Sequence, residues 1–272
     1  MNTTELRQFA AEIRTAALEC LESFGSGHIG GSMSIVEALA VLYGGALRHD
    51  PQNPNWQERD RLVLSKGHAG PALYAALALR GFFPREMLLT LNQGGTHLPS
   101  HVDRTKTPGV DMTCGSLGQG ISAAIGMALG SRLNGWNNKT YLILGDGECD
   151  EGQVWEGAMF AAHYKLSSLI CFVDYNKQQL GGFLENVLDL GDIAAKFRSF
   201  SWNVIEAPGH DVAAIAGAVA AAGAQTRRPT AIILDTIKGY GVDFAQGVEF
   251  NHSMSFTKEQ IGAAIAAIRS GI

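Results

Sequence analysis

Apolar and polar positions follow two patterns along the chain, one typical of helices and one typical of buried strands. Apolar side chains recur at helical spacing between residues 4 and 24, and Thr3 or Thr4 could cap this helix. Continuous apolar runs of four or five residues, such as 141–144 and 169–173, predict strands that are buried on both faces. The same patterns predict further helices at 34–47, 71–79, 84–91, 192–200, 212–222 and 257–268, a helix that opens at 115–120 and runs to 133, and further strands at 61–65, 203–205 and 230–236.

The order of these elements predicts the fold class. Helices and strands alternate along most of the chain, which is typical of an α/β protein. We therefore expect a doubly wound, mainly parallel sheet with helices on both faces, in a single domain spanning residues 1–272.

One strand–helix–strand unit carries polar residues at the ends of both strands. Asp146 follows the run 141–144 within Gly145-Asp146-Gly147-Glu148, and Asn176 follows the run 169–173. Neighbouring parallel strands lie about 4.8 Å apart, and open α/β sheets bind ligands at the carboxyl ends of their strands. Asp146 and Asn176 can therefore reach a single ion, although an ordinary loop with incidental polar residues would give the same pattern.

The glycine motifs narrow the kind of ligand. The glycines at 115, 118 and 120 do not match the dinucleotide fingerprint, and no G-x-x-x-x-G-K-[ST] segment is present. A phosphate group would then be held by backbone amides at a helix start, by neutral histidines and by a metal. Magnesium fits, because it prefers hard oxygen ligands and often retains phosphate oxygens among them. The working hypothesis is a metal–diphosphate site.

Histidines form a second group of candidates. A single loop histidine is usually an ordinary surface residue, and on the pattern alone this remains the commoner interpretation for each one, but four at the ends of predicted elements make functional roles worth testing. Four lie in glycine-rich or polar loops of this kind, namely His28, His68, His101 and His252. The remaining four are less distinctive: His49, His97, His163 and His210.

Composition excludes some classes of protein. The net charge of −5 argues against a nucleic-acid binder, which would carry a basic patch. Charged residues make up only 17%, below the usual quarter, so part of the surface is expected to be covered by a partner subunit. The four cysteines form no zinc-binding or disulfide pattern, which favours a reducing cytoplasm. The N-terminus does not resemble a signal peptide, and no apolar run approaches the length of a membrane span.

Five segments, in order, resemble the transketolase family of thiamine-diphosphate enzymes. Ser26-Gly27-His28-Ile29-Gly30 is similar to the family's SGHPG loop, and Leu64–Ala69 is similar to its LS-x-GHA segment. Pro108–Thr113 followed by GSLGQG resembles the PGVE block, and GDGE…EG with VDYN resembles the diphosphate motif at the family's spacing. The resemblance covers nearly all of the chain. It is strongest to the N-terminal half that split transketolases carry as a separate subunit, which implies the thiamine-diphosphate-binding fold.

The resemblance implies roles for particular residues. It implies Mg²⁺ bound by Asp146, Asn176 and the backbone carbonyl of Gln178. It implies thiamine diphosphate contacted by His68, Gly147, Asn176 and His252 near its diphosphate, and by Gly115, Ser116 and Leu117 near its rings. It implies a sugar site with His28, His101 and His252 as catalytic residues.

The implied activity is transfer of a two-carbon ketol unit from a ketose, or ketose phosphate, to an aldose acceptor. In the family a glutamate on a following pyrimidine-binding domain activates the cofactor, and this chain ends before that domain. The resemblance therefore implies a C-terminal partner subunit that supplies the glutamate, an α2β2 heterotetramer, and no activity for this chain alone.

Departures from the family surround the sugar site. Ile29 and Val102 stand where the family usually has proline, Ser32 replaces a frequent proline, and Asn251-His252-Ser253 replaces a W-H-G-like stretch. They leave two alternatives open. One is a split thiamine-diphosphate transferase or synthase that acts on a different or modified sugar, and the other is a non-catalytic cofactor-binding subunit.

Overall fold

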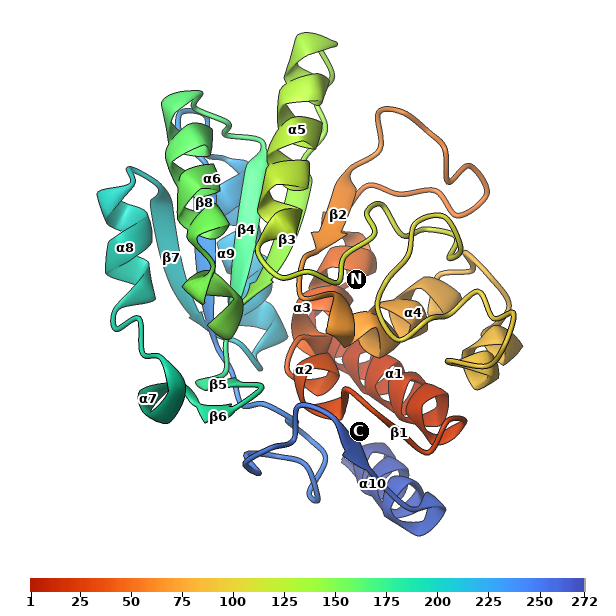
Figure 1. Cartoon of the computed structure of the whole chain (residues 1–272). Helices are drawn as coiled ribbons and strands as arrows, with labels where there is room; N and C mark the ends of the chain where they lie inside the picture. Colours follow the sequence, from red (N-terminus) through yellow and green to blue (C-terminus); the bar gives the residue numbers. More distant parts are fainter. Residues whose placement is uncertain (272) are drawn as a thin grey trace.

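A five-stranded parallel sheet forms the centre of the molecule in the computed structural model, which describes residues 1–271. Its strand order is β2-β3-β4-β8-β7, and every neighbouring pair is parallel (Figure 1). The strands are β2 (Arg61–Leu64), β3 (Thr140–Gly145), β4 (Leu169–Tyr175), β7 (Asn203–Pro208) and β8 (Thr230–Asp235). The predicted parallel α/β sheet is confirmed, and β3 and β4 are adjacent within it.

Helices cover both faces of the sheet, which explains why the central strands are continuously apolar. The helices α5 (Gln119–Leu133), α6 (Gly152–His163) and α8 (Ile193–Ser199) pack on one face (Figure 1). The opposite side carries α1 (Thr3–Glu22), α3 (Val36–Val41), α4 (Gly70–Leu79) and α9 (Val212–Gly223).

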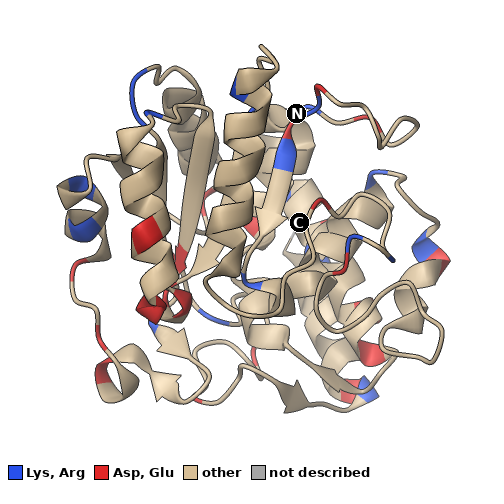
Figure 2. Ribbon diagram, turned by 45° about the horizontal axis from the view of Figure 1, so that its top comes forward, with Lys and Arg blue, Asp and Glu red and all other residues tan. Residues whose placement is uncertain are grey.

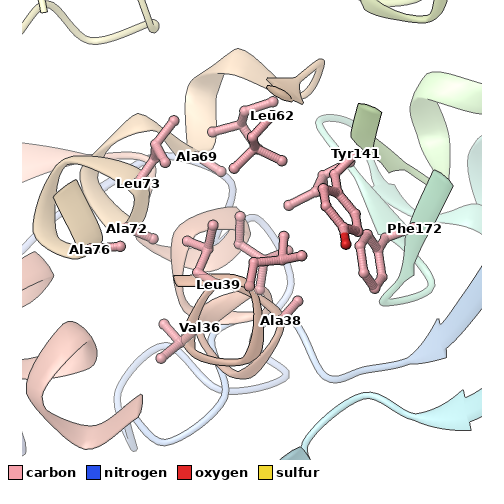
Figure 3. Packing of buried hydrophobic residues seen from close by; sticks show 14 of the residues in the cluster. Val36, Ala38, Leu39, Leu62, Ala69, Ala72, Leu73, Ala76, Tyr141 and Phe172 are labelled. Carbon is pink, nitrogen blue, oxygen red and sulfur yellow. The ribbon is translucent and has the colours of Figure 1, made fainter. Parts of the chain in front are cut away.

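Part of the core lies where α3 stands between α4 and the sheet. Figure 3 shows Val36, Ala38 and Leu39 of α3 between Leu73 of α4 and the aromatic rings of Tyr141 and Phe172. All six residues of α3 are buried, so this helix is apolar on almost every side. This packing fixes β3 and β4, the two strands that lead to Asp146 and Asn176.

Some helix boundaries differ from the sequence-based prediction. The cap of α1 is Asn2, not Thr3 or Thr4: Asn2 Oδ1 accepts from Glu5 N at 3.0 Å, and the Glu5 carboxylate accepts from Asn2 N at 2.7 Å. The helix predicted at 34–47 is α3 followed by a π-helical turn, η1 (Leu42–Ala46), which contains Gly45 at φ +146°. The helix predicted at 84–91 is a 3₁₀ helix, η3 (Arg85–Thr90).

Short elements not predicted from the sequence surround the carboxyl edge of the sheet. They are α2 (Ile29–Met33), η2 (Gly67–Ala69), η4 (Gly147–Asp150), α7 (Leu184–Val187), and the antiparallel pairs β1 (Ser26–Gly27) with β9 (Met254–Ser255) and β5 (Gln178–Gln179) with β6 (Gly182–Phe183). The β1–β9 pair brings the His28 loop beside the His252 loop. The last helix is α10 (Lys258–Ser270). Within residues 1–271, no helix combines the length and apolar character that crossing a bilayer requires.

Candidate functional site

Sheet register places Asp146 and Asn176 side by side, as predicted. Gly145 at the end of β3 pairs with Asp174 of β4, so the next residues of the two strands leave the sheet together. Backbone amides then fix the Asp146 carboxylate: Gly147 N donates to Oδ1 at 2.8 Å and Lys177 N donates to Oδ2 at 2.6 Å. Both contacts leave carboxylate lone pairs free for a cation.

Asp174 is a buried anchor beneath these two residues. Its carboxylate is fully buried and accepts from Lys66 Nζ at 2.5 Å, Ser34 Oγ at 2.7 Å and Thr236 Oγ1 at 2.5 Å. Asn176 Nδ2 donates to it at 2.9 Å, which directs the amide oxygen of Asn176 away from Asp174. Burial alone would raise the pKa of Asp174, but Lys66 and the hydroxyl donors lower it below its ordinary value. Asp174 therefore stays ionised and balances the buried Lys66.

The environment of Asp146 suits a hard divalent cation. Burial, followed by the nearby Asp174 charge, raises the pKa of Asp146 to about 7. A bound cation would relieve this penalty, because it supplies the opposite charge that the buried carboxylate lacks. Among residues 1–271 no three His, Cys, Asp or Glu side chains gather as a metal site. The predicted set of one carboxylate, one amide oxygen and one backbone carbonyl is instead an all-oxygen set, as Mg²⁺ prefers.

Lys238 is a second buried cation in the site, and its role was not predicted from the sequence. Its ammonium lies 3.2 Å from the carbonyl oxygen of Gln179, 3.5 Å from that of Gln178, and 3.4 Å from His252 Nδ1. No carboxylate of the described residues lies within ion-pair distance of it. Burial and the neighbouring Lys66 lower the pKa of Lys238 to about 8. An anionic ligand would satisfy this ammonium, which makes Lys238 a candidate diphosphate contact.

Glu148 joins three segments around the cavity. Its Oε1 accepts from Ser65 Oγ and from Gly118 N, and its Oε2 accepts from Gly145 N at 3.0 Å. The side chain is buried, and burial raises its pKa. Glu148 thereby holds the glycine-rich entry to α5 against the ends of β2 and β3. The one feature of the sequence that pointed to a role for Glu148 was its position in GDGE, directly after a predicted buried strand.

Four of the eight histidines cluster beside the carboxyl edge of the sheet. The His28 ring centroid lies 5.1 Å from that of His101, 5.3 Å from His252 and 5.6 Å from His68, and His68 lies 4.5 Å from His252. Burial and neighbouring positive groups lower the pKa of His28 to about 4 and that of His252 to about 3, and the pKa values of His68 and His101 are lowered as well. The four rings are therefore neutral near pH 7, each with one donor and one acceptor nitrogen.

The other histidines are separate from this cluster. His97 is exposed and its Nδ1 lies 3.1 Å from Lys106 O. His210 stacks on Tyr240 at 3.6 Å and hydrogen-bonds Glu37, which indicates a structural role.

A cavity of about 170 Å³ lies between the acidic edge and the histidines. Nine of the predicted site residues line it: His68, His101, Gly115, Leu117, Asp146, Gly147, Asn176, Gln178 and His252. His28 does not line the cavity itself but packs against His101, which does. Ser116 is exposed on the loop that leads into α5. Clefts of about 630 and 690 Å³ lie elsewhere, but neither contains a histidine. The smaller cavity would enclose one end of a ligand rather than all of it.

The fold and this edge define a class of protein: an α/β domain whose parallel sheet ends in a buried, oxygen-rich edge beside a cluster of neutral histidines. Comparison with known families gives the particular family. The model described as "Transketolase, thiamine diphosphate binding domain" matches residues 6–269. The chain belongs to this family.

Two relatives match along most of their length. The chain is 51% identical to the 6-deoxy-6-sulfo-D-fructose transketolase subunit of Clostridium sp. (strain MSTE9), over 97% of this chain and 96% of that one. It is 34% identical to an apulose-4-phosphate transketolase subunit of Phocaeicola vulgatus, over 95% of this chain and 92% of that one. The transketolase of Campylobacter jejuni has the same fold with a TM-score of 0.92 at 28% identity, covering 99% of this chain and 43% of the longer enzyme.

Proposed function

We propose that this chain is the diphosphate-binding subunit of a two-chain transketolase that uses thiamine diphosphate and Mg²⁺. One observation carries the proposal: a single cavity joins the Asp146–Asn176 edge to three neutral histidines, against which the His28 ring packs. The first feature suits a metal–diphosphate tail and the second suits a polyhydroxylated sugar. When bound, thiamine diphosphate would supply the reactive carbon for cleaving and forming the bond beside a ketose carbonyl.

At the inner end of the cavity, Asp146, Asn176 and the carbonyl of Gln178 would hold Mg²⁺. His68, Gly147 and Lys238 would contact the diphosphate, and Lys238 would add positive charge there because Lys66 is already paired with Asp174. The cofactor rings would lie along Gly115, Ser116 and Leu117. A Cβ at Gly115 would meet nothing within 4 Å, so this backbone is open to a ligand.

At the outer end, His28, His101 and His252 would bind the sugar. A neutral imidazole can accept a proton from one hydroxyl while its other nitrogen donates to a second. Lowered pKa values keep these rings available as proton acceptors near pH 7. They would therefore both orient the ketose and carry protons between its hydroxyls.

A second chain would complete the site. Relatives named as subunits of transketolases support this expectation. The surface of α5 and α6 also supports it, because α5 carries one charged residue, Arg132 (Figure 2), and the pair exposes Leu133, Met159 and Phe160. We propose an α2β2 assembly in which the partner supplies the pyrimidine-binding domain and its glutamate. We expect it to form in a reducing cytoplasm, because all four cysteines are free and buried.

The donor is proposed to be a ketose with an anionic group at its far end. The names of relatives support this: one acts on a sulfonated fructose and one on a sugar phosphate. The 51% identity favours the sulfonated sugar as the first donor to test. With this donor, the alternative of a modified sugar is also tested, because the reaction is still the transfer of a ketol unit.

The test mixes this chain with its partner chain, thiamine diphosphate, Mg²⁺ and an aldose phosphate acceptor. Donors would be 6-deoxy-6-sulfofructose, fructose 6-phosphate and apulose 4-phosphate, with the released aldose and the new ketose measured by mass spectrometry. Transfer is expected only with both chains, and it should stop when Mg²⁺ is chelated. Transfer by this chain alone would contradict the two-chain proposal. Cofactor binding by the assembled pair without transfer from any donor would favour a non-catalytic role for this chain.

A further inference from the structure

We propose that Asn251 is a positioning residue that sets the sugar-facing histidines by attaching the His252 loop to the first turn of α2. Asn251 is 1% exposed and lies directly before His252. Its backbone oxygen accepts from Gly30 N at 3.1 Å, and Gly30 lies two residues after His28. We call this the Asn251–Gly30 contact. It connects the segments on which two of the four histidines stand.

The side chain of Asn251 also shapes its own loop. Its Nδ2 donates to Lys238 O at 3.1 Å and to Ala245 O at 2.7 Å. Gly239 N, next to Lys238, donates to Gly30 O at 3.0 Å, so the loop touches α2 at a second point. One amide group therefore fixes both Lys238 and His252 relative to α2.

The contact needs glycine at position 30. A Cβ there would lie 2.6 Å from the Asn251 backbone oxygen and 2.7 Å from its Oδ1, closer than real Cβ atoms approach such atoms. The φ of Gly30 is not in the left-handed region, so alanine would be excluded by lack of room alone. Phe250, directly before Asn251, has φ +64°, a strained conformation for an aromatic residue. Such strain persists where neighbouring contacts hold the chain in place.

Loss of the Asn251 contacts should change the arrangement of the histidines at the outer end of the cavity. The His28 and His252 rings meet edge-on at 5.3 Å and 89°, and the ring nitrogens of His252 have one contact in the described residues, with Lys238. Their arrangement is therefore set by the backbone that carries them, and a displacement of about 1 Å in reacting groups can cost about a hundredfold in rate. The Asp146–Asn176 edge depends on β3, β4 and Asp174 instead, so it should respond less, because Lys238 is the one inner-end residue that Asn251 holds among those proposed here.

The test compares Asn251→Ala with a matched control, Asn138→Ala. Asn138 is also buried, also donates from Nδ2 to a backbone carbonyl (Arg59 O, 2.9 Å), and also has a buried Oδ1 without a partner. It precedes β3 at the opposite end of the strand from Asp146. Each variant is assembled with the partner chain. The interpretation of kcat/KM rests on the proposed function. We therefore also measure the NMR resonances of the histidine rings and the Kd for thiamine diphosphate with Mg²⁺.

For Asn251→Ala we expect kcat/KM for the donor ketose to fall by at least about tenfold, and the Kd for the cofactor to rise by a smaller factor because the same side chain also holds Lys238. The resonances of His28 and His252 should shift. Asn138→Ala should lower thermal stability similarly and leave kinetics and resonances unchanged. Equal kinetic losses in the two variants, or unmoved resonances in Asn251→Ala, would overturn the proposal.

Gly30→Ala displaces the same loop by a different route: its Cβ would press on the backbone oxygen of Asn251, whereas Asn251→Ala removes the side-chain bonds within the loop. It should reproduce the kinetic defect of Asn251→Ala, and the double variant should be little worse than either single one, because both act through the position of one loop. Multiplied defects in the double variant would overturn the proposal even if Asn251→Ala folds poorly. If the wild-type pair transfers no ketol unit from any donor, the proposed function fails, and the NMR comparison still decides the role of Asn251.

Discussion

The two ends of the cavity are built in different ways. At the inner end, the carboxylates of Asp146, Asp174 and Glu148 accept hydrogen bonds from backbone amides and buried side chains at nearly every position. At the outer end, the four clustered histidines make two ring hydrogen bonds among the described residues. His28 Nδ1 lies 3.4 Å from Ser100 Oγ, and His252 Nδ1 lies 3.4 Å from Lys238 Nζ.

This difference fits the roles proposed for the two ends: the inner end would hold the ligand, and the outer end would react with it. A densely hydrogen-bonded network is rigid, and it would hold in place the charges that the proposed metal and diphosphate need. The histidine nitrogens are left largely unpaired, so they can exchange hydrogen bonds and protons with a sugar. Substitutions at the inner end should therefore abolish binding or stability, and those at the outer end should reduce turnover.

The largest effect is expected for Asp146→Ala. The variant removes the only carboxylate of the proposed metal site, so binding of thiamine diphosphate with Mg²⁺ should become undetectable by titration calorimetry. The matched control is Asp235→Asn, which alters a mostly exposed carboxylate at the end of β8, the strand on the other side of β4 from β3. It should bind the cofactor like the wild type. Normal binding by Asp146→Ala would remove this residue from the metal site.

Lys66→Met should destabilise the protein by about 3–5 kcal/mol, because it leaves the buried Asp174 without its charge partner. Adding Asp174→Asn should recover part of this loss. Lys177→Met is the control, since its ion pair with Asp235 is largely exposed and should contribute less than about 1 kcal/mol. Urea unfolding of the three variants measures the difference. Equal losses for Lys66→Met and Lys177→Met would contradict the view of the inner end as a tightly balanced network.

His28→Ala addresses the outer end. It should lower kcat by about a hundredfold, because one proton carrier and one sugar contact are lost, while cofactor affinity changes little. His97→Ala, an exposed histidine outside the cluster, should leave both quantities unchanged. A large loss of cofactor affinity in His28→Ala, with kcat retained, would move this residue from the sugar to the diphosphate.

The sequence allowed prediction of features that follow from strand geometry. Asp146 and Asn176 were predicted to meet because each follows a buried apolar run, and parallel strands end at one edge of a sheet. The clustered histidines were predicted as candidates from loop placement and from the family resemblance together. The buried charges Asp174, Lys66 and Lys238 were not assigned roles, because a charged residue at the end of a strand or in a loop looks the same in sequence whether it is exposed or buried.

The helix α2 was missed for a related reason. Its segment, Ile29–Met33, contains two consecutive glycines, which disfavour helix formation by local propensity. Tertiary contacts explain both glycines: a Cβ at Gly31 would lie 2.9 Å from His68 Nε2, and one at Gly30 would meet Asn251. Packing around the site overrides propensity here, and one sequence alone does not reveal which loops will meet.

The smallest expected effect is a pH dependence of stability from His28. Burial and neighbouring positive groups lower its pKa to about 4 in the folded protein, against about 6.5 in the unfolded chain. Between these values the unfolded state binds more protons, so stability falls as the pH drops from 6.5 towards 4. From pH 7.5 to pH 5.5, His28 should account for about 1 kcal/mol of lost stability. His28→Asn should reduce the loss measured by urea unfolding at the two pH values, whereas His97→Asn should not. An unchanged pH dependence in His28→Asn would mean that the ring takes up its proton in the folded protein without cost, as an open, solvated histidine does.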